Sequence, residues 1–64
     1  MREINIDYVK KFMVNANEEI DDSNGNWYGV KETPTRLIVT RNGYIQRVCK
    51  TYEAVVKYLK KEGC

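Results

Sequence analysis

The sequence contains no histidine, and this absence removes several chemistries at once. A Ser/His or Cys/His nucleophile pair needs an imidazole as its base, and histidine is also the commonest metal ligand. Only two cysteines, Cys49 and Cys64, are present, and their spacing fits neither a C-x-x-C redox motif nor a zinc site. We therefore expect no catalytic residue, no metal and no cofactor, and we predict that the chain is not an enzyme.

Signatures of phosphate loops, membranes and secretion are missing as well. Gly25 and Gly29 are isolated and are not followed by the Lys-Ser/Thr of a phosphate-binding loop. No apolar run approaches the ~20 residues of a membrane helix, and residues 1–7 lack the apolar region of a signal peptide. We expect a cytoplasmic protein with no membrane partner, in which both cysteines are reduced thiols and Cys64 frays.

Length and composition indicate a small globular chain. Of the 64 residues, 42% are hydrophobic and 31% are charged, a balance that is not typical of disorder. A chain of this length buries only ~60% of the surface that its unfolded form exposes, so the core must be small. We predict one small α+β domain over residues 1–64.

Charge is distributed unevenly along the chain. Residues 17–32 carry five acidic side chains and one lysine, whereas residues 33–64 carry seven basic and two acidic side chains. The net charge of +2 is too small to indicate nucleic acid by itself. The alternatives are charge complementarity within the fold and a charged binding surface. Asp21 and Asp22 lie in a loop predicted over residues 21–26, which we expect to be mobile and solvated, with ordinary pKa values.

The clearest local signal is a β-hairpin over residues 36–49. Residues 36–40 are rich in β-branched side chains, and Asn42-Gly43 is the strongest short hairpin signal, because a type I′ turn needs positive φ at both positions. Residues 44–49 form the return strand. Strict alternation assigns to the core face Leu37, Val39, Tyr44 and Val48. It assigns to the outer face Arg36, Ile38, Thr40, Ile45, Arg47 and Cys49, and a slip of one residue would exchange the two faces.

A helix is predicted over residues 52–62. Thr51 is a suitable N-cap, and Val55 and Leu59 recur four residues apart on one face. Lysines occupy the last turn, where the helix dipole favours cations, and Gly63 is a natural C-cap. The predicted fold is thus a small antiparallel sheet with the 36–49 hairpin at its centre, packed against this helix.

The first third of the chain allows two interpretations. Val9, Phe12, Met13 and Ala16 recur at helical spacings, whereas Phe12, Val14 and Ala16 also alternate as in a strand. Asn15 and Asn17 are poor residues for the middle of a helix. We predict a short N-terminal helix near residues 4–11, followed by a strand over residues 12–16.

From residue 28 onward, the order of signals resembles the C-terminal half of the thioredoxin fold. Thr33-Pro34, a strand, Asn42-Gly43, a second strand and a helix follow one another, and residues 12–18 look like the central strand and acidic turn upstream. The resemblance covers residues 12–61 and implies a cis peptide bond at Pro34. Since the half that carries the redox Cys-x-x-C is absent, it implies a degenerate thioredoxin-like protein without thiol-disulfide exchange.

A strand, Asn42-Gly43, a second strand and Thr51-x-Glu53-Ala54 are also similar to the small sheet-plus-helix DNA-binding domains of phage integrases and AP2 proteins. This resemblance implies a three-stranded sheet in the major groove, with Trp27 and Tyr28 in its first strand. The aromatic residue that usually precedes the threonine is missing here. The cations of such a nucleic-acid-binding module would be Arg36, Arg41, Arg47, Lys50 and Lys57.

Aromatic side chains make up 11% of the chain, and several of its tyrosines exceed what so small a core can bury. Tyr, Trp and Arg are also the residue types that dominate interface hot spots. We predict a partner-binding surface on the outer hairpin face, in which two arginines flank exposed aliphatic side chains. Its residues are Arg36, Ile38, Tyr44, Ile45, Arg47 and Trp27.

The function predicted from these observations is non-catalytic binding of another protein. A chain this small, without a catalytic constellation, is typical of phage or mobile-element accessory and inhibitor proteins that occupy a host protein. The strand predicted at 12–16 has no obvious neighbour, so a homodimer is also expected. Nucleic-acid binding is the alternative.

Overall fold

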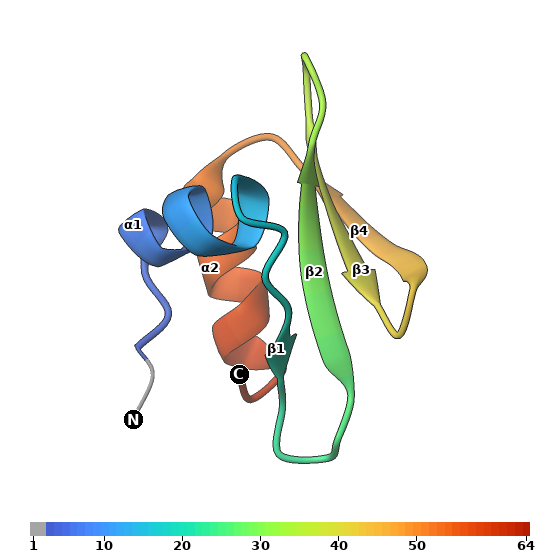
Figure 1. Ribbon diagram of the computed structural model, residues 1–64. Coiled ribbons are helices and arrows are strands. Elements are labelled where there is room, and N and C mark those ends of the chain that lie inside the picture. Colours follow the sequence, from blue (N-terminus) through green and yellow to red (C-terminus); the bar gives the residue numbers. More distant parts are fainter. Residues whose placement is uncertain (1–2) are drawn as a thin grey trace.

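A four-stranded antiparallel sheet carries two helical regions on one of its faces (Figure 1). The computed structural model of the chain describes residues 3–64. The strands follow one another across the sheet in chain order. In sequence, the elements are α1 (Ile6–Tyr8), the π-helical segment η1 (Val9–Val14), β1 (Ile20–Asp21), β2 (Trp27–Glu32), β3 (Leu37–Arg41), β4 (Tyr44–Cys49) and α2 (Tyr52–Lys61). This arrangement confirms the predicted α+β class, but the hairpin of β3 and β4 lies at one edge of the sheet and not at its centre.

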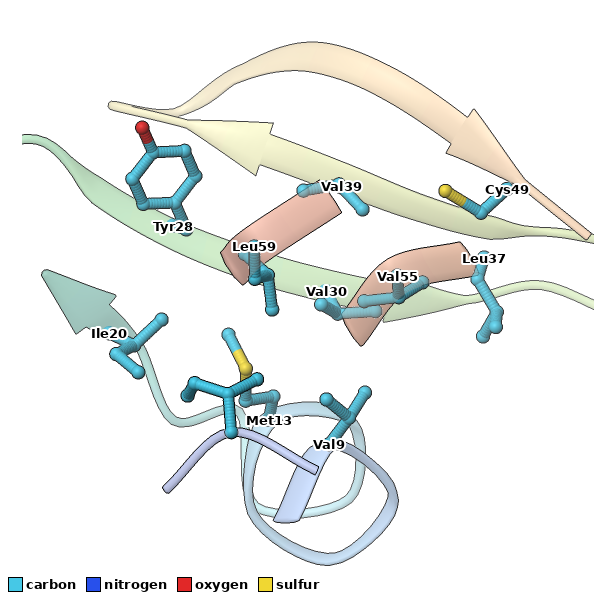
Figure 2. Packing of buried hydrophobic residues seen from close by; sticks show 11 residues of the cluster. Val9, Met13, Ile20, Tyr28, Val30, Leu37, Val39, Cys49, Val55 and Leu59 are labelled. Carbon is cyan, nitrogen blue, oxygen red and sulfur yellow. The ribbon is translucent and has the colours of Figure 1, made fainter. Parts of the chain in front are cut away.

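The core lies between the helices and the inner face of the sheet (Figure 2). Val9 and Met13 of η1 and Val55 and Leu59 of α2 are fully buried. They meet a row of buried sheet residues, Ile20, Tyr28, Val30, Leu37, Val39 and Cys49. Burying these apolar side chains is the main source of stability in a chain this short.

The predicted hairpin turn is confirmed. Asn42 and Gly43 have φ of 53° and 87°, and Arg41 pairs directly with Tyr44 across the turn. Positive φ at both central positions is the requirement of a two-residue type I′ hairpin. The Asn42 side chain adds a second anchor, because its Oδ1 accepts a 3.0 Å hydrogen bond from the backbone N–H of Trp27.

A β-bulge in β4 overturns part of the predicted face assignment. Val39 pairs with Arg47 and Thr40 pairs with Ile45, so Gln46 is an extra residue without a partner on β3. Since side chains alternate between faces, one extra residue moves every later side chain to the other face. Cys49 is therefore 3% exposed in the core, whereas Val48, predicted to be buried, is 53% exposed. Arg47, predicted on the outer face, pairs with the fully buried Val39 on the inner face.

Helix α2 matches its predicted limits to within one residue. Oγ1 of Thr51 accepts a 3.2 Å hydrogen bond from the backbone N–H of Ala54, which is the expected N-cap. At the other end, Gly63 has φ of 88° and donates to the carbonyl of Lys60, while Cys64 donates to the carbonyl of Leu59. These two bonds form a Schellman motif. Cys64 is thus held against the core, contrary to the prediction that it frays.

The strand predicted over residues 12–16 is wrong, because the chain stays helical from Ile6 to Val14. Asn5 caps this region by accepting a 2.8 Å hydrogen bond from the N–H of Tyr8. Val9 and Met13, four residues apart, are buried, while Phe12 is 47% exposed. The asparagines act after the helix, where Asn17 adopts φ of 54°.

Two further expectations concern Pro34 and the cysteines. The Thr33–Pro34 peptide bond is trans, unlike the cis bond that the thioredoxin resemblance implies. Cys49 and Cys64 are both free thiols, as predicted. The second resemblance places a strand at Trp27 and Tyr28, and β2 continues from there to Glu32.

Candidate functional site

Within residues 3–64, no helix covers the outer face of the sheet, and this face carries exposed apolar side chains. Lys31, Ile38 and Val48 are cross-strand neighbours on this face, and so are Gly29, Thr40 and Ile45. Trp27 shares the face, because its neighbour Tyr28 points into the core. The apolar members, which we name the outer-face patch, are Trp27, Ile38, Ile45 and Val48.

The patch is open at its β4 side. Ile45 is 64% exposed and Val48 is 53% exposed. In the described part of the chain, β4 pairs only with β3, so its second edge is free. Proteins usually protect a free edge with lysine, proline or a bulge. Here the bulge at Gln46 is present, but β4 contains neither lysine nor proline.

The six residues predicted to bind a partner do not form one surface. Trp27, Ile38 and Ile45 lie together on the outer face. Tyr44, which is 74% exposed, and Arg47 belong to the inner face because they pair with Arg41 and Val39. Arg36 lies in the turn before β3, where its guanidinium donates to the carbonyl of Thr35. The predicted pair of flanking arginines is therefore not assembled.

Val48 belongs to the patch but was missing from the sequence prediction. Strict alternation from the Asn42-Gly43 turn assigns it to the core, and only the bulge at Gln46 places it outside. The only signal available was the possible one-residue slip between the two faces.

Cations gather on the opposite side of β4. An open groove of about 200 Å³ lies between the inner face of β4 and α2. We name it the basic groove, and its lining residues are Arg47, Ala54, Lys57, Tyr58 and Lys61. The guanidinium carbon of Arg47 lies 5.6 Å from the centre of the Tyr58 ring, which fixes its position by a cation–π contact. Burial, followed by the charge of Glu62, raises the pKa of Tyr58 above its ordinary value, so the phenol is protonated.

The loop after β1 is ordered by Asp22, contrary to the prediction of a mobile acidic loop. Oδ1 of Asp22 accepts hydrogen bonds from the backbone N–H groups of Asn24 and Asn26, at 2.7 and 3.0 Å. Its Oδ2 accepts from the Tyr28 hydroxyl at 2.8 Å and from the Asn26 amide at 3.1 Å. Desolvation opposes ionisation, but these donors outweigh it and lower the pKa of Asp22 to about 2. The carboxylate therefore serves the fold and is not available as a ligand.

Neither thiol is suited to act as a nucleophile. Cys49 is buried, and burial together with the carboxylates of Asp22, Glu62 and Asp21 raises the pKa of Cys64 to about 11. A thiol with so high a pKa is almost entirely un-ionised near neutral pH and is a poor nucleophile.

Within residues 3–64, no three side chains of the His, Cys, Asp and Glu types come together as a metal site would require. The same residues include no helix that combines the length and the apolar character needed to cross a membrane. Comparison of the chain with protein-family models, with curated proteins and with solved structures finds no match.

Proposed function

We propose that the chain is a non-catalytic protein-binding module whose partner docks on the outer-face patch. The observation that carries this proposal is the exposure of Ile45 and Val48, at 64% and 53%, on a strand with a free edge and no covering helix. Adjacent exposed apolar side chains on a protein surface are typical of an interaction site. Trp27 at the rim supplies the aromatic type that is enriched in interface hot spots.

The chemistry of the outer face favours a protein over duplex DNA. The second resemblance would place DNA against this face, where phosphate contacts need cations. Arg41 and Arg47, which such a module would use, have inner-face register instead. Lys31 of β2 does share the face with the patch, because it pairs with Ile38 of β3. An apolar centre with a polar rim is the composition of a protein interface.

The free edge of β4 indicates the mode of binding. A partner strand placed beside β4 would satisfy its unpaired backbone groups, and its side chains would cover Ile45 and Val48. A second copy of the chain is one candidate for that partner. A host protein occupied by a phage or mobile-element accessory protein is the other.

The proposal is tested by affinity purification from the native host with two charge-matched variants. The patch variant combines Ile45→Asp with Val48→Asp, which adds two negative charges to the outer face. The helix control variant combines Lys10→Gln with Lys11→Gln, two exposed residues of η1, and changes the net charge equally. Circular dichroism melts establish that both variants fold.

We expect a stoichiometric partner of the wild-type chain to be lost from the patch variant and retained by the helix control variant. If both patch side chains are hot spots, binding weakens by roughly 2 kcal/mol or more. Retention by the patch variant would show that the partner binds elsewhere. Sedimentation equilibrium on the purified chain decides whether the partner is a second copy, because a clean monomer at high micromolar concentration excludes the homodimer.

A further inference from the structure

The basic groove brings together three cations that the fold does not neutralise. In the described part of the chain, no ion pair joins a carboxylate to Arg47, Lys57 or Lys61. Lys57 and Lys61 are four residues apart on α2, so their side chains are neighbours, and like charges at this spacing destabilise a helix. Arg47 faces them from β4 across the groove. The arrangement opposes stability, and a bound anion would offset the repulsion.

Arg47 is positioned for such an anion. Its contact with the Tyr58 ring favours a position of the guanidinium at the wall of the groove. A planar guanidinium with fixed orientation binds phosphate through two parallel hydrogen bonds, which a mobile lysine cannot do. The acidic neighbours are Glu53, one turn before Lys57 on α2, and Glu62, just beyond the end of the helix. Glu62 contacts Arg41 at 3.8 Å and accepts a 3.4 Å hydrogen bond from the Tyr58 hydroxyl, and neither carboxylate lines the groove.

The shape of the groove selects an extended ligand. Its lining on α2 runs from Ala54 to Lys61, which is about 10 Å along the helix axis at the usual rise per residue. Lys57 and Lys61 therefore present positive charges one helical turn apart along an open channel. A strand that repeats its negative charge along its length matches this spacing, whereas an isolated carboxylate meets only one of the cations.

One exposed aromatic ring and one half-buried ring complete the pattern. Tyr44 is 74% exposed and shares the inner face of β4 with Arg47, and Tyr58 lines the groove itself. A cationic groove beside aromatic rings is the combination by which proteins hold single-stranded nucleic acid, with phosphates on the cations and bases on the rings. We propose that the basic groove binds the phosphodiester backbone of single-stranded nucleic acid. This site lies on the other face of the sheet from the outer-face patch and does not depend on it.

The test measures the fluorescence anisotropy of two labelled oligonucleotides, a twelve-nucleotide oligothymidylate and the matching oligouridylate. Each is titrated with the protein at several salt concentrations. The groove variant combines Lys57→Gln with Lys61→Gln, and the helix control variant removes the same charge from η1. We expect affinity for at least one oligonucleotide to fall ten-fold or more in the groove variant and less than two-fold in the control. The salt slope should fall by about 1.4, because each phosphate contact on a single strand contributes about 0.7. The two oligonucleotides show whether the natural strand is DNA or RNA.

Tyr44→Ala should weaken binding several-fold without changing the salt slope, since stacking releases no counterions. Three results would overturn the proposal. The first is no binding of either oligonucleotide at low salt. The second is an equal loss in the groove and control variants, which indicates net charge alone. The third is equal or tighter binding of duplex DNA or of an oligoglutamate peptide, which would assign the groove to another anion.

Discussion

The hydroxyl of Tyr28 donates a 2.8 Å hydrogen bond to Oδ2 of Asp22, and this bond links the core of the sheet to the acidic loop. The Tyr28 ring is buried among apolar side chains, while its oxygen reaches the loop that closes β1 onto β2. Burial, together with the hydrogen bond and charge of Asp22, raises the pKa of Tyr28 to about 12. The pair therefore stays in one protonation state, neutral phenol and ionised carboxylate, over the whole physiological range.

This pair predicts the acid sensitivity of the fold. The pKa of Asp22 is about 2 in the folded chain, against an ordinary value of 3.8, so the unfolded chain takes up its proton first as pH falls. The stabilisation is complete above the unfolded value and is lost as pH falls through the folded one. Urea melts between pH 6 and pH 2 should show Asp22→Asn less stable than the wild type at pH 6, with the difference closing towards pH 2. A constant difference across that range would contradict the assignment.

The hairpin turn depends on Gly43. Its φ of 87° is strained for any β-branched residue, so Gly43→Val should destabilise the chain by about 1 kcal/mol or more. The matched control is Tyr44→Val, which places the same side chain at the next position, in an exposed strand site that favours it. Thermal melts of the two variants make the comparison. Equal melting temperatures would show that the stability of the chain does not depend on glycine in this turn.

The face of η1 that meets the core can be tested with neighbouring residues. Met13 is fully buried, so Met13→Ala should cost about 2 kcal/mol or more, through lost burial and the cavity left behind. Phe12→Ala removes a larger side chain that is 47% exposed and should cost less than half as much. Denaturant titrations give both values. The reverse order would favour the strand over residues 12–16.

Neither cysteine should support redox cycling. Cys49 is buried, and the raised pKa of Cys64 leaves little thiolate near neutral pH. Alkylation by iodoacetamide should be slow in the native chain and fast for both thiols in denaturant. Electrophoretic mobility should not change with dithiothreitol, and a band that did shift would indicate a disulfide that the fold does not contain.

Local signals in the sequence predicted much of the fold. The Asn42-Gly43 turn, the Thr51 cap and the Val55/Leu59 spacing each act within a few residues, so the hairpin and α2 could be predicted together with their contacts to the core. The strand over 12–16 was wrong because Phe12 and Ala16 satisfy both the helical and the strand period. Packing of Met13 against the sheet decides between them, and no local pattern reveals that contact.

The candidate site was harder to predict from the sequence than the fold. Nothing in the local sequence marks Gln46 as a bulge, yet this bulge moves Arg47 to the inner face and Val48 to the outer face beside Ile45. The predicted surface was therefore divided between two faces, and the meeting of Arg47 with Lys57 and Lys61 followed from tertiary structure alone. Asp22 shows the same limit, since its donors are assembled only when the loop folds back on Tyr28.

The order of the strands also bears on how the chain folds. Every strand of the sheet pairs with the one that follows it in sequence, so each pairing closes only a short loop and costs little chain entropy. The inner face of that sheet is covered by helical residues from both ends of the chain, Val9 and Met13 of η1 and Val55 and Leu59 of α2. Helix docking is thus expected after the transition state, and a Val55→Ala variant that unfolds faster while folding at the wild-type rate is the kinetic signature of that order.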